Sequence, residues 1–432
     1  MTASRDLFRM TATALAERLG RREISAFEVI ASHLERIRDR EPLIRAWAII
    51  DADRALERAR ELDRGPIVGP LHGLPIAVKD VIDTADFPTE RGSPIYRGRH
   101  PAADAACVDA ARRAGAIVLG KSVTTELAAF KPAATVNPRN FAHTPGGSSS
   151  GSAAAVADEM VPLAFGTQTF GSVIRPASYC GVVGYKPSFG TIPTDGVLRL
   201  AESLDTVGVF ARSVDDAALL AGVAAGRSDL VEIVPRTAPP RIGICRTYEW
   251  SAVDDAGRDA LERAATELAR SGARIRTVEL PAPFADLGAA CEDIYGFELS
   301  RNLADVRRMH AALLSDGFRG SIDAGTRVSH ERYARAQRVA SACRAAFAGV
   351  LAELDVLLTP STTGEAPLGL DTTGSPIMNR NFTLLHAPAV NVPALSSPRG
   401  LPVGLQVVGG LGDDRRALSA AKWIHERLAG PL

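Results

Sequence analysis

The chain has 432 residues, of which 46% are hydrophobic and 23% are charged, and its formal net charge at pH 7 is +0. This length is enough for one or two substantial hydrophobic cores. Balanced charge gives no electrostatic attraction to nucleic acid or to an anionic membrane, so we expect neither as a partner. The five cysteines are an odd number, are widely spread and contain no C-x-x-C pair, which argues against a disulfide framework and against a zinc site.

The N-terminal stretch from Met1 to Met10 carries charges but lacks the apolar stretch of a secretory signal. No window of about 18 uncharged apolar residues predicts a transmembrane helix. We therefore expect a cytoplasmic protein, with no metal and no cofactor.

The predicted elements alternate between helix and strand along the chain. Two amphipathic helices over 13–39, ending before Pro42, are followed by a helix at 51–63 and a short buried strand at 76–80. Further on we expect helices at 104–114, 152–157, 213–225, 254–271 and 413–428, with a mainly helical stretch at 290–353. Strands are expected at 116–119, 161–165, 241–245, 274–279, 355–359, 388–395 and 402–408. This alternation favours an α/β fold.

The domain organisation follows from the same pattern. No clean boundary divides the chain, so we predict one domain over 1–432, with a mixed central β-sheet flanked by α-helices. The segment 241–380 is expected to be an elaboration of this core that shapes the substrate pocket.

Three segments stand out as carriers of chemistry. They are Pro75–Asp80 (P-I-A-V-K-D), Pro145–Ser152 (P-G-G-S-S-S-G-S) and Gly166–Pro176 (G-T-Q-T-F-G-S-V-I-R-P). A serine is a weak nucleophile and needs a nearby base. The histidines offer no obvious partner by spacing, so a neutral lysine is the next choice. Only five of the 50 basic residues are lysine, and arginine cannot take this role because it does not lose its proton.

Each of these segments also has an ordinary explanation. A lone lysine after a strand is usually solvated, and a Gly/Ser run is usually a linker or, less often, a phosphate-binding loop. The run at 145–152, however, lies between ordered-looking segments and opens directly onto a helix. It also lacks the Lys-Ser/Thr ending of a P-loop.

Taken together, the three motifs resemble those of the amidase signature family. The stretches Asp355–Pro360 (D-V-L-L-T-P) and Leu401–Gly409 (L-P-V-G-L-Q-V-V-G) are similar to that family too, and the resemblance covers nearly the whole chain. Within the family the chain looks most like malonamidase-like and aryl-amidase-like bacterial enzymes. The resemblance implies the amidase signature fold and an amidohydrolase that acts on linear C–N bonds.

The resemblance also implies a catalytic triad. Ser172 would be the nucleophile that forms an acyl-enzyme, and Ser148, after a cis Gly147–Ser148 peptide bond, would relay its proton to Lys79. Lys79 would be a neutral base that later returns the proton to the leaving amine. Because a lysine in water has a pKa of about 10.4, this role requires burial.

The remaining implied residues surround the nucleophile. The backbone N–H groups of Thr169, Phe170, Gly171 and Ser172 would form the oxyanion hole, with Arg175 and Gln168 bracing the loop. Gly147, Asn379, Arg380 and His386 are the candidate substrate-binding residues. Phe170 departs from the family, which usually has glycine there, and we expect its ring either to shape the substrate pocket or to pack into the core.

Two other interpretations stay open. Gly147–Gly151 fits G-x-S-x-G, so an α/β-hydrolase esterase could use Ser149 as its nucleophile. Alternatively, the chain could be the amidase-like subunit of a tRNA-dependent amidotransferase, although Gln168 in G-T-Q-T, where that subunit has G-T-D-T, disfavours it. The favoured substrate is a small amide, with aryl amides, carbamates (urethanes) and ureas in range. We accordingly expect a small-molecule partner, no nucleic acid, no membrane, and a homodimer as the assembly to consider.

Overall fold

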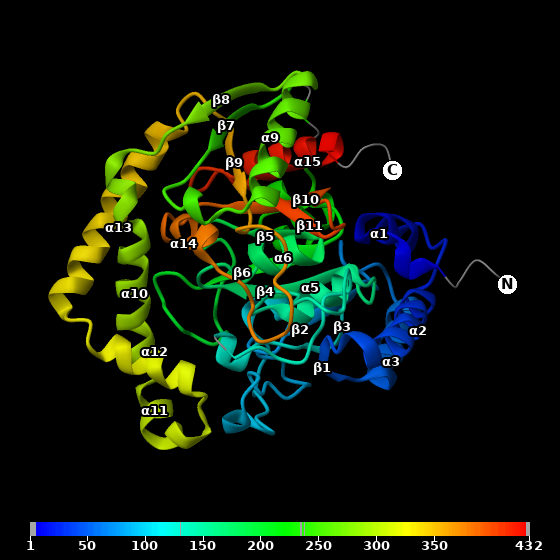
Figure 1. Ribbon diagram of the computed structural model, residues 1–432. Helices are drawn as coiled ribbons and strands as arrows, with labels where there is room; N and C mark the ends of the chain where they lie inside the picture. The colour runs from blue at the N-terminus through cyan, green and yellow to red at the C-terminus, as the bar shows by residue number, and fades with distance from the viewer. Residues whose placement is uncertain (1–5, 130, 234–235, 237, 429–432) are drawn as a thin grey trace.

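One sheet of eleven strands organises the computed structural model, which describes residues 6–129, 131–233, 236 and 238–428 (Figure 1). Its strands are β1 (Trp47–Ile50), β2 (Pro75–Lys79), β3 (Ile117–Ser122), β4 (Leu163–Gln168), β5 (Val183–Lys186), β6 (Thr206–Ala211), β7 (Arg241–Cys245), β8 (Arg274–Val278), β9 (Val356–Pro360), β10 (Ala389–Ser396) and β11 (Pro402–Val408). Their spatial order is β1-β3-β2-β4-β6-β5-β10-β11-β9-β7-β8. Strands from the N-terminal and the C-terminal parts of the chain therefore belong to the same sheet.

The sheet is mixed, as predicted. Strands β3, β2 and β4 are parallel neighbours, and so are β9, β7 and β8, while the strands between these two groups pair antiparallel. Every residue of β2 and of β4 is buried. Such uninterrupted burial is typical of parallel strands that are covered on both faces.

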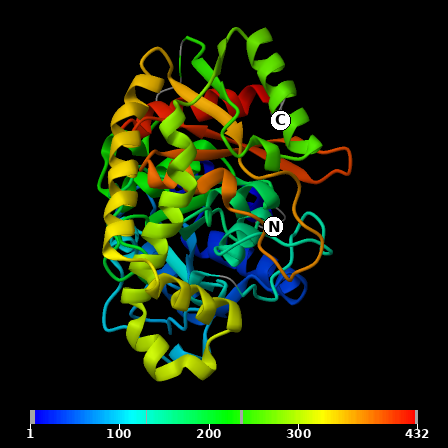
Figure 2. The same cartoon turned by 60° about the vertical axis from the view of Figure 1, so that its left-hand side comes forward.

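Helices cover the sheet on several sides. They are α1 (Ala12–Gly20), α2 (Ala26–Ile44), α3 (Ala52–Arg64), α4 (Ala106–Arg113), α5 (Ser150–Ala157), α6 (Ile174–Cys180), α7 (Val214–Ala225), α8 (Ser228–Val231), α9 (Asp255–Arg270), α10 (Leu287–Asn302), α11 (Ala304–His310), α12 (Asp316–Thr326), α13 (His330–Val350), α14 (Ile377–Leu384) and α15 (Asp414–Leu428). Helix α5 packs on β2 and β4, and α6 packs on β5, β10 and β11. Helices α10 and α13 pack side by side, and turning the molecule brings them forward with α11 and α12 (Figure 2).

The differences from the predicted elements have local causes. Strands β1, β5 and β6 were not predicted, because each is a short apolar run without a clear alternating pattern. Helix α2 was expected to end before Pro42 but continues to Ile44. Pro42 lies in the last turn of α2, where a proline removes only one helical hydrogen bond before the helix ends.

The segment 241–380 contributes strands to the central sheet as well as helices around it. It adds β7, β8 and β9 to one end of the sheet and supplies α9 to α14. Its helix α10 contacts α14. The one-domain interpretation and the pocket-shaping role of this segment stay predictions.

Three further observations concern thiols, membrane spans and metal ligands. The five cysteines are free and buried. Among the helices of the described residues, none is both long enough and apolar enough to span a bilayer. Within the described ranges, no group of three or more His, Cys, Asp or Glu side chains is placed to hold a metal ion.

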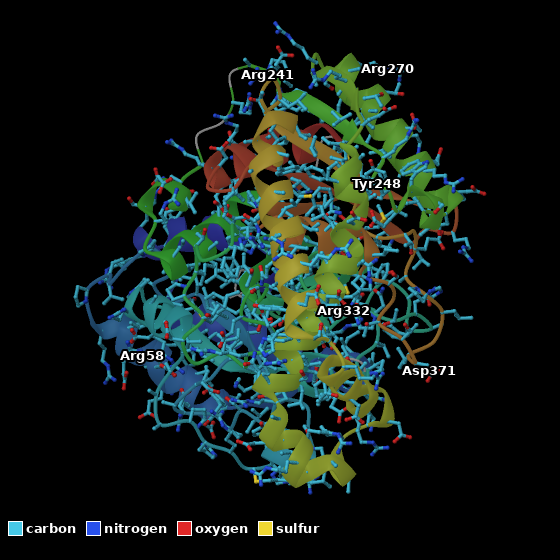
Figure 3. The ribbon with its side chains drawn as sticks, turned by 90° about the vertical axis from the view of Figure 1, so that its left-hand side faces the viewer. Arg58, Arg241, Tyr248, Arg270, Arg332 and Asp371 are labelled. Carbon is cyan, nitrogen blue, oxygen red and sulfur yellow. The ribbon has the colours of Figure 1, made fainter. Side chains whose placement is uncertain are left out.

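A buried hydrogen bond between β5 and α15 tests how the C-terminal helix is held. The hydroxyl of Tyr185 donates to Asp414 Oδ1 at 2.5 Å, and the N–H of Ser188 donates to the same oxygen at 2.8 Å. We expect Tyr185→Phe to lower the free energy of unfolding by about 1–3 kcal/mol, since a buried carboxylate loses a donor. The control is Tyr248→Phe, because the exposed Tyr248 (Figure 3) donates only to the Leu280 carbonyl, and it should change stability by less than about 0.5 kcal/mol. Urea denaturation measures both, and equal losses would contradict the argument.

Candidate active site

Lys79 is the last residue of β2 and has no exposed surface. Its Nζ donates to Ser148 Oγ and to Thr167 Oγ1, each at 2.7 Å. Thr167 comes from β4, which pairs parallel to β2 with Val78 opposite Phe165. Parallel pairing therefore carries both side chains to the same edge of the sheet.

The surroundings of Lys79 favour the neutral amine. Burial lowers the pKa of Lys79 well below its usual value, the charge of Asp205 raises it, and the charge of Arg175 lowers it further. Both hydrogen-bond partners of Nζ are hydroxyl groups, which do not neutralise an ammonium ion as a bound carboxylate would. A neutral amine at this position can accept a proton.

The turn before α5 brings Ser148 to this amine. The Gly147–Ser148 peptide bond is cis, which agrees with the expectation from the motif. Arg175 Nη2 donates to the Gly147 carbonyl at 2.7 Å and to Thr373 Oγ1 at 3.1 Å. A Cβ atom at Gly147 would lie 2.7 Å from Thr373 Cγ2, so a larger residue does not fit there. Ser148 itself is 2% exposed.

Gln168 braces the loop that carries the second serine. Its Oε1 accepts the N–H groups of Val173 and Ile174 at 2.9 and 3.1 Å, at the start of α6. Its Nε2 donates to Thr383 Oγ1 at 2.9 Å, and Thr383 Oγ1 donates to the Phe170 carbonyl at 3.0 Å. One side chain thus connects the end of β4, the start of α6 and helix α14.

This bracing orients the backbone next to Ser172. Because the C=O and N–H of a trans peptide point in opposite directions, holding the Phe170 carbonyl toward Thr383 turns the N–H of Gly171 the other way. In the part of the chain that the structure describes, no hydrogen bond uses the backbone N–H of Thr169, Phe170, Gly171 or Ser172 as donor. Unpaired N–H groups beside a serine can stabilise a developing oxyanion.

Ser172 and Ser148 line the same cavity, which has a volume of about 550 Å³. Its wall also includes Thr169, Phe170, Arg175, Leu200, Glu292, Tyr295, Asp371–Ile377 and Arg380. Asp371 lies at the outer edge of the segment between β9 and α14 (Figure 3). Within the described residues, Lys79 is hydrogen-bonded to Ser148, but the hydroxyls of Ser148 and Ser172 are not hydrogen-bonded to each other. The two serines are related only by lining the same cavity. Such contacts often tighten only when substrate is bound.

The predicted substrate-binding residues divide into two groups. Arg380 lines the cavity and pairs with Glu292 of α10 at 2.6 Å. Asn379 does not line the cavity: it is buried behind the loop, with its Oδ1 against Gly171 and its Nδ2 donating to the Ser361 carbonyl.

His386 does not line the cavity either. Its ring stacks on Phe189 at 4.1 Å between centroids, and its Nε2 lies 2.9 Å from the Ser203 carbonyl. Burial lowers the pKa of His386 to about 4. Its position indicates support of neighbouring loops rather than contact with substrate.

Phe170 is one of the residues that line the cavity. It is partly buried and meets the ring of Tyr295 at 4.7 Å between centroids, with 51° between the planes. Phe170 and Tyr295 both line the cavity, and Phe170 also packs against the hydrophobic core, so the pocket interpretation of Phe170 stays a prediction.

Several residues of the site were missed by sequence reasoning. Thr167 and Asp205 contact or influence the catalytic groups, and Glu292, Tyr295 and Asp371 complete the wall. Thr167 could have been found, because it lies inside the G-T-Q-T motif. The wall residues lie on α10 and on a loop without any motif, so only the fold reveals them.

The esterase interpretation based on Ser149 is wrong. An elbow nucleophile follows a strand directly, but among the described residues no strand lies between β3 and α5. Ser149 has no exposed surface, and its Oγ is 3.3 Å from both the carbonyl and the N–H of Thr167. The side chain therefore faces β4 and not the cavity.

Comparisons with known proteins agree with this geometry. The family model described as Amidase matches residues 28–418. A glutamyl-tRNA(Gln) amidotransferase subunit from Acidothermus cellulolyticus is 37% identical over 95% of this chain and 93% of its own length. A crystal structure of an amidase is 29% identical, with a TM-score of 0.89 over 97% of this chain and 100% of that one. The native peptide amidase from Stenotrophomonas maltophilia is 30% identical, with a TM-score of 0.80 over 97% of both chains.

The family match covers most of the chain, and both solved structures share its fold over nearly their whole length. The implied amidase signature fold, with its mixed sheet, is thereby confirmed, and so is enzymatic cleavage of C–N amide bonds. The chain belongs to the amidase family.

Proposed function

We propose that this chain hydrolyses the side-chain amide of glutamine, serving as the amidase component of a tRNA-dependent amidotransferase. The observation that carries the proposal is the buried Lys79–Ser148 hydrogen bond at a cavity that also contains Ser172. The relative from Acidothermus cellulolyticus supports the choice of substrate and assembly, because it matches nearly the full length of the chain.

In the proposed reaction, Ser172 Oγ attacks the amide carbonyl, and its proton passes through Ser148 to the neutral Lys79. The N–H groups of residues 169–172 stabilise the oxyanion. As the C–N bond breaks, Lys79 returns the proton through Ser148 to the departing ammonia, leaving an acyl group on Ser172. Water then attacks this acyl-enzyme by the same relay and releases the acid.

Charges in the cavity wall suit an amino acid substrate. Arg380 carries a positive charge, and Glu292 and Asp371 carry negative charges around the same space. Glutamine has a carboxylate and an ammonium group besides its amide, so a wall with both signs of charge can bind both ends. Arg380 Nη1 pairs with Glu292 Oε1 at 2.6 Å, and its buried Nε has no hydrogen-bond partner among the described residues.

This proposal corrects two expectations from the sequence. The prediction of a small-molecule partner without nucleic acid is overturned by the relative, whose name assigns it to a glutamyl-tRNA(Gln) amidotransferase. The net charge of this chain did not predict an RNA partner, because another subunit of an assembly can contact the RNA. Gln168 does not disfavour such an assembly either, because its Oε1 accepts two backbone N–H groups, as a carboxylate oxygen would. A cytoplasmic location stays a prediction.

A second candidate is hydrolysis of a free amide by the chain alone. The observation in its favour is the aromatic wall of Phe170 and Tyr295, which suits an aryl or other apolar group next to the amide. The amidase and peptide amidase structures of similar fold support the same chemistry.

Substrate assays separate these two candidates. We expect the purified chain to release ammonia from L-glutamine. Adding the other subunits of such an amidotransferase together with glutamyl-tRNA(Gln) should yield glutaminyl-tRNA(Gln). Ser172→Ala should abolish both reactions. Efficient cleavage of anilides, peptide amides, carbamates or ureas with no ammonia from glutamine would instead establish the second candidate.

The base role of Lys79 predicts a pH-dependent rate. Only the neutral amine accepts a proton, so kcat/KM of the wild type should rise with pH through the lowered pKa of Lys79. Lys79→Met keeps the length of the side chain and should lower the rate by about 10²-fold or more. Near-normal turnover of this variant at neutral pH would refute the assignment.

The same pKa predicts a pH dependence of stability. Between the lowered folded-state pKa and the unfolded-state value of about 10.4, the unfolded chain binds one more proton at Lys79 than the folded chain does. Lys79 therefore makes the free energy of unfolding increase with pH in this window, by about 1.4 kcal/mol per pH unit. Subtracting the slope of Lys79→Met from that of the wild type in urea denaturation isolates this contribution. Identical slopes would show that the pKa is not depressed.

The ring of Phe170 predicts substrate selectivity. Phe170→Gly should change the preference between a bulky and a small amide by roughly tenfold, or about 1.4 kcal/mol, because it opens space in the cavity. Phe189→Gly is the matched control, since Phe189 is also partly buried and stacks on one aromatic ring, but lies outside the cavity lining. For both variants, kcat/KM on the two substrates measures selectivity, and Tm measures stability. Unchanged selectivity with a large loss of stability in Phe170→Gly would end the pocket interpretation.

A further inference from the structure

The pairing of β4 with β6 places an acidic residue beside the oxyanion loop. Gln168 ends β4 opposite Thr206, the first residue of β6. In an antiparallel pair, the residue after Gln168 and the residue before Thr206 are then also neighbours. These residues are Thr169 and Asp205, and Thr169 Oγ1 donates to Asp205 Oδ1 at 2.6 Å.

The second oxygen of the same carboxylate holds another part of the cavity wall. Asp205 Oδ2 accepts the N–H groups of Leu200 and Ala201 at 2.7 and 2.9 Å. Leu200 lines the cavity, as Thr169 does. An ionised carboxylate has only acceptors, so Asp205 can satisfy all three donors at once and tie the oxyanion loop to the turn at 200–201.

The charge of Asp205 also reaches the catalytic amine. Burial raises the pKa of Asp205 to about 6, and its three hydrogen bonds favour the ionised form. The charged groups that act on Lys79 are Asp205, which raises its pKa, and Arg175, which lowers it. Glu298 and the phenol of Tyr295 are the other titratable groups that interact with Asp205.

We propose that Asp205 is a positioning residue for the reaction at Ser172, which fixes the oxyanion loop through Thr169 and acts on Lys79 through its negative charge. The inference rests on the proposed acyl-enzyme mechanism but not on the identity of the substrate. Asp205 lies outside the three sequence motifs, so the motifs alone do not predict this role.

Covalent labelling of Ser172 by a fluorophosphonate tests this role without a known substrate. The Ser172 oxygen forms a bond to phosphorus, fluoride leaves, and the serine proton passes to Lys79, so the step uses both the base and the oxyanion hole. We expect Asp205→Asn, which keeps the shape of the side chain, to slow labelling by about tenfold or more, as measured by mass spectrometry of the intact chain.

Two readouts distinguish positioning from general support of the fold. First, loss of the negative charge should lower the pKa of Lys79 further. The acid limb, which is the fall of the labelling rate as the pH decreases, should therefore shift to lower pH in Asp205→Asn. Second, at a pH where Lys79 is neutral in all variants, Asp205 acts on the rate through Thr169, so there Thr169→Val combined with Asp205→Asn should be hardly slower than Thr169→Val alone. An unshifted acid limb, or rate losses that simply multiply, would overturn the proposal.

Asp216→Asn is the matched control. Asp216 is a buried aspartate that also accepts a threonine hydroxyl and a backbone N–H, both from Thr13, at 2.9 and 2.8 Å. It does not line the cavity, so its variant should lose thermal stability yet keep the labelling rate and pH profile of the wild type. Wild-type protein that is not labelled at Ser172 would refute the proposed mechanism itself. Normal labelling of the wild type and an unchanged rate in Asp205→Asn would refute only the role of Asp205.

Discussion

A lysine buried without a bound carboxylate is the constraint on which the rest of the site depends. Lys79 at the end of β2 has no exposed surface and, within the described residues, donates to the hydroxyls of Ser148 and Thr167. Burial disfavours the ammonium form, whereas a carboxylate at hydrogen-bonding distance would stabilise it and remove the base. The fully buried parallel strands β2 and β4 create this environment, so the interior of the sheet also provides the burial that the proposed proton relay requires.

The loop that carries Ser172 is shaped by a neighbour in the chain and by residues distant from it. Its backbone is held by Gln168 at the end of β4, by Thr383 on α14 and, through Thr169, by Asp205 before β6. Each of these side chains binds a carbonyl, an N–H or a hydroxyl of the loop or of the residues that follow it. Among the described residues, the backbone N–H groups of residues 169–172 have no protein acceptor and can stabilise charge that develops on a substrate.

Chemistry and selectivity come from different parts of the fold. The signature segments at the end of β2, before α5 and between β4 and α6 supply the amine and the serines. Helices α10 and α14 and the segment between β9 and α14 supply the charged part of the wall and Tyr295. The same bond-breaking machinery can therefore act on a free amide or on glutamine within a larger assembly, depending on that wall. This separation explains why membership of the family determines the reaction more firmly than the substrate.

The sequence by itself determined the fold class and named the candidate reacting groups. Motif residues such as Lys79 and Ser148 are encoded by local patterns, because the chemistry requires those residue types in a set order, and the structure brings these two together. The tertiary structure alone decided which other residues join them. It placed Tyr295 and Glu292 in the cavity, moved His386 away from it and set Asp205 beside the oxyanion loop. These contacts arise from strand register and helix packing between segments distant along the chain, and no local pattern of residues encodes such distances.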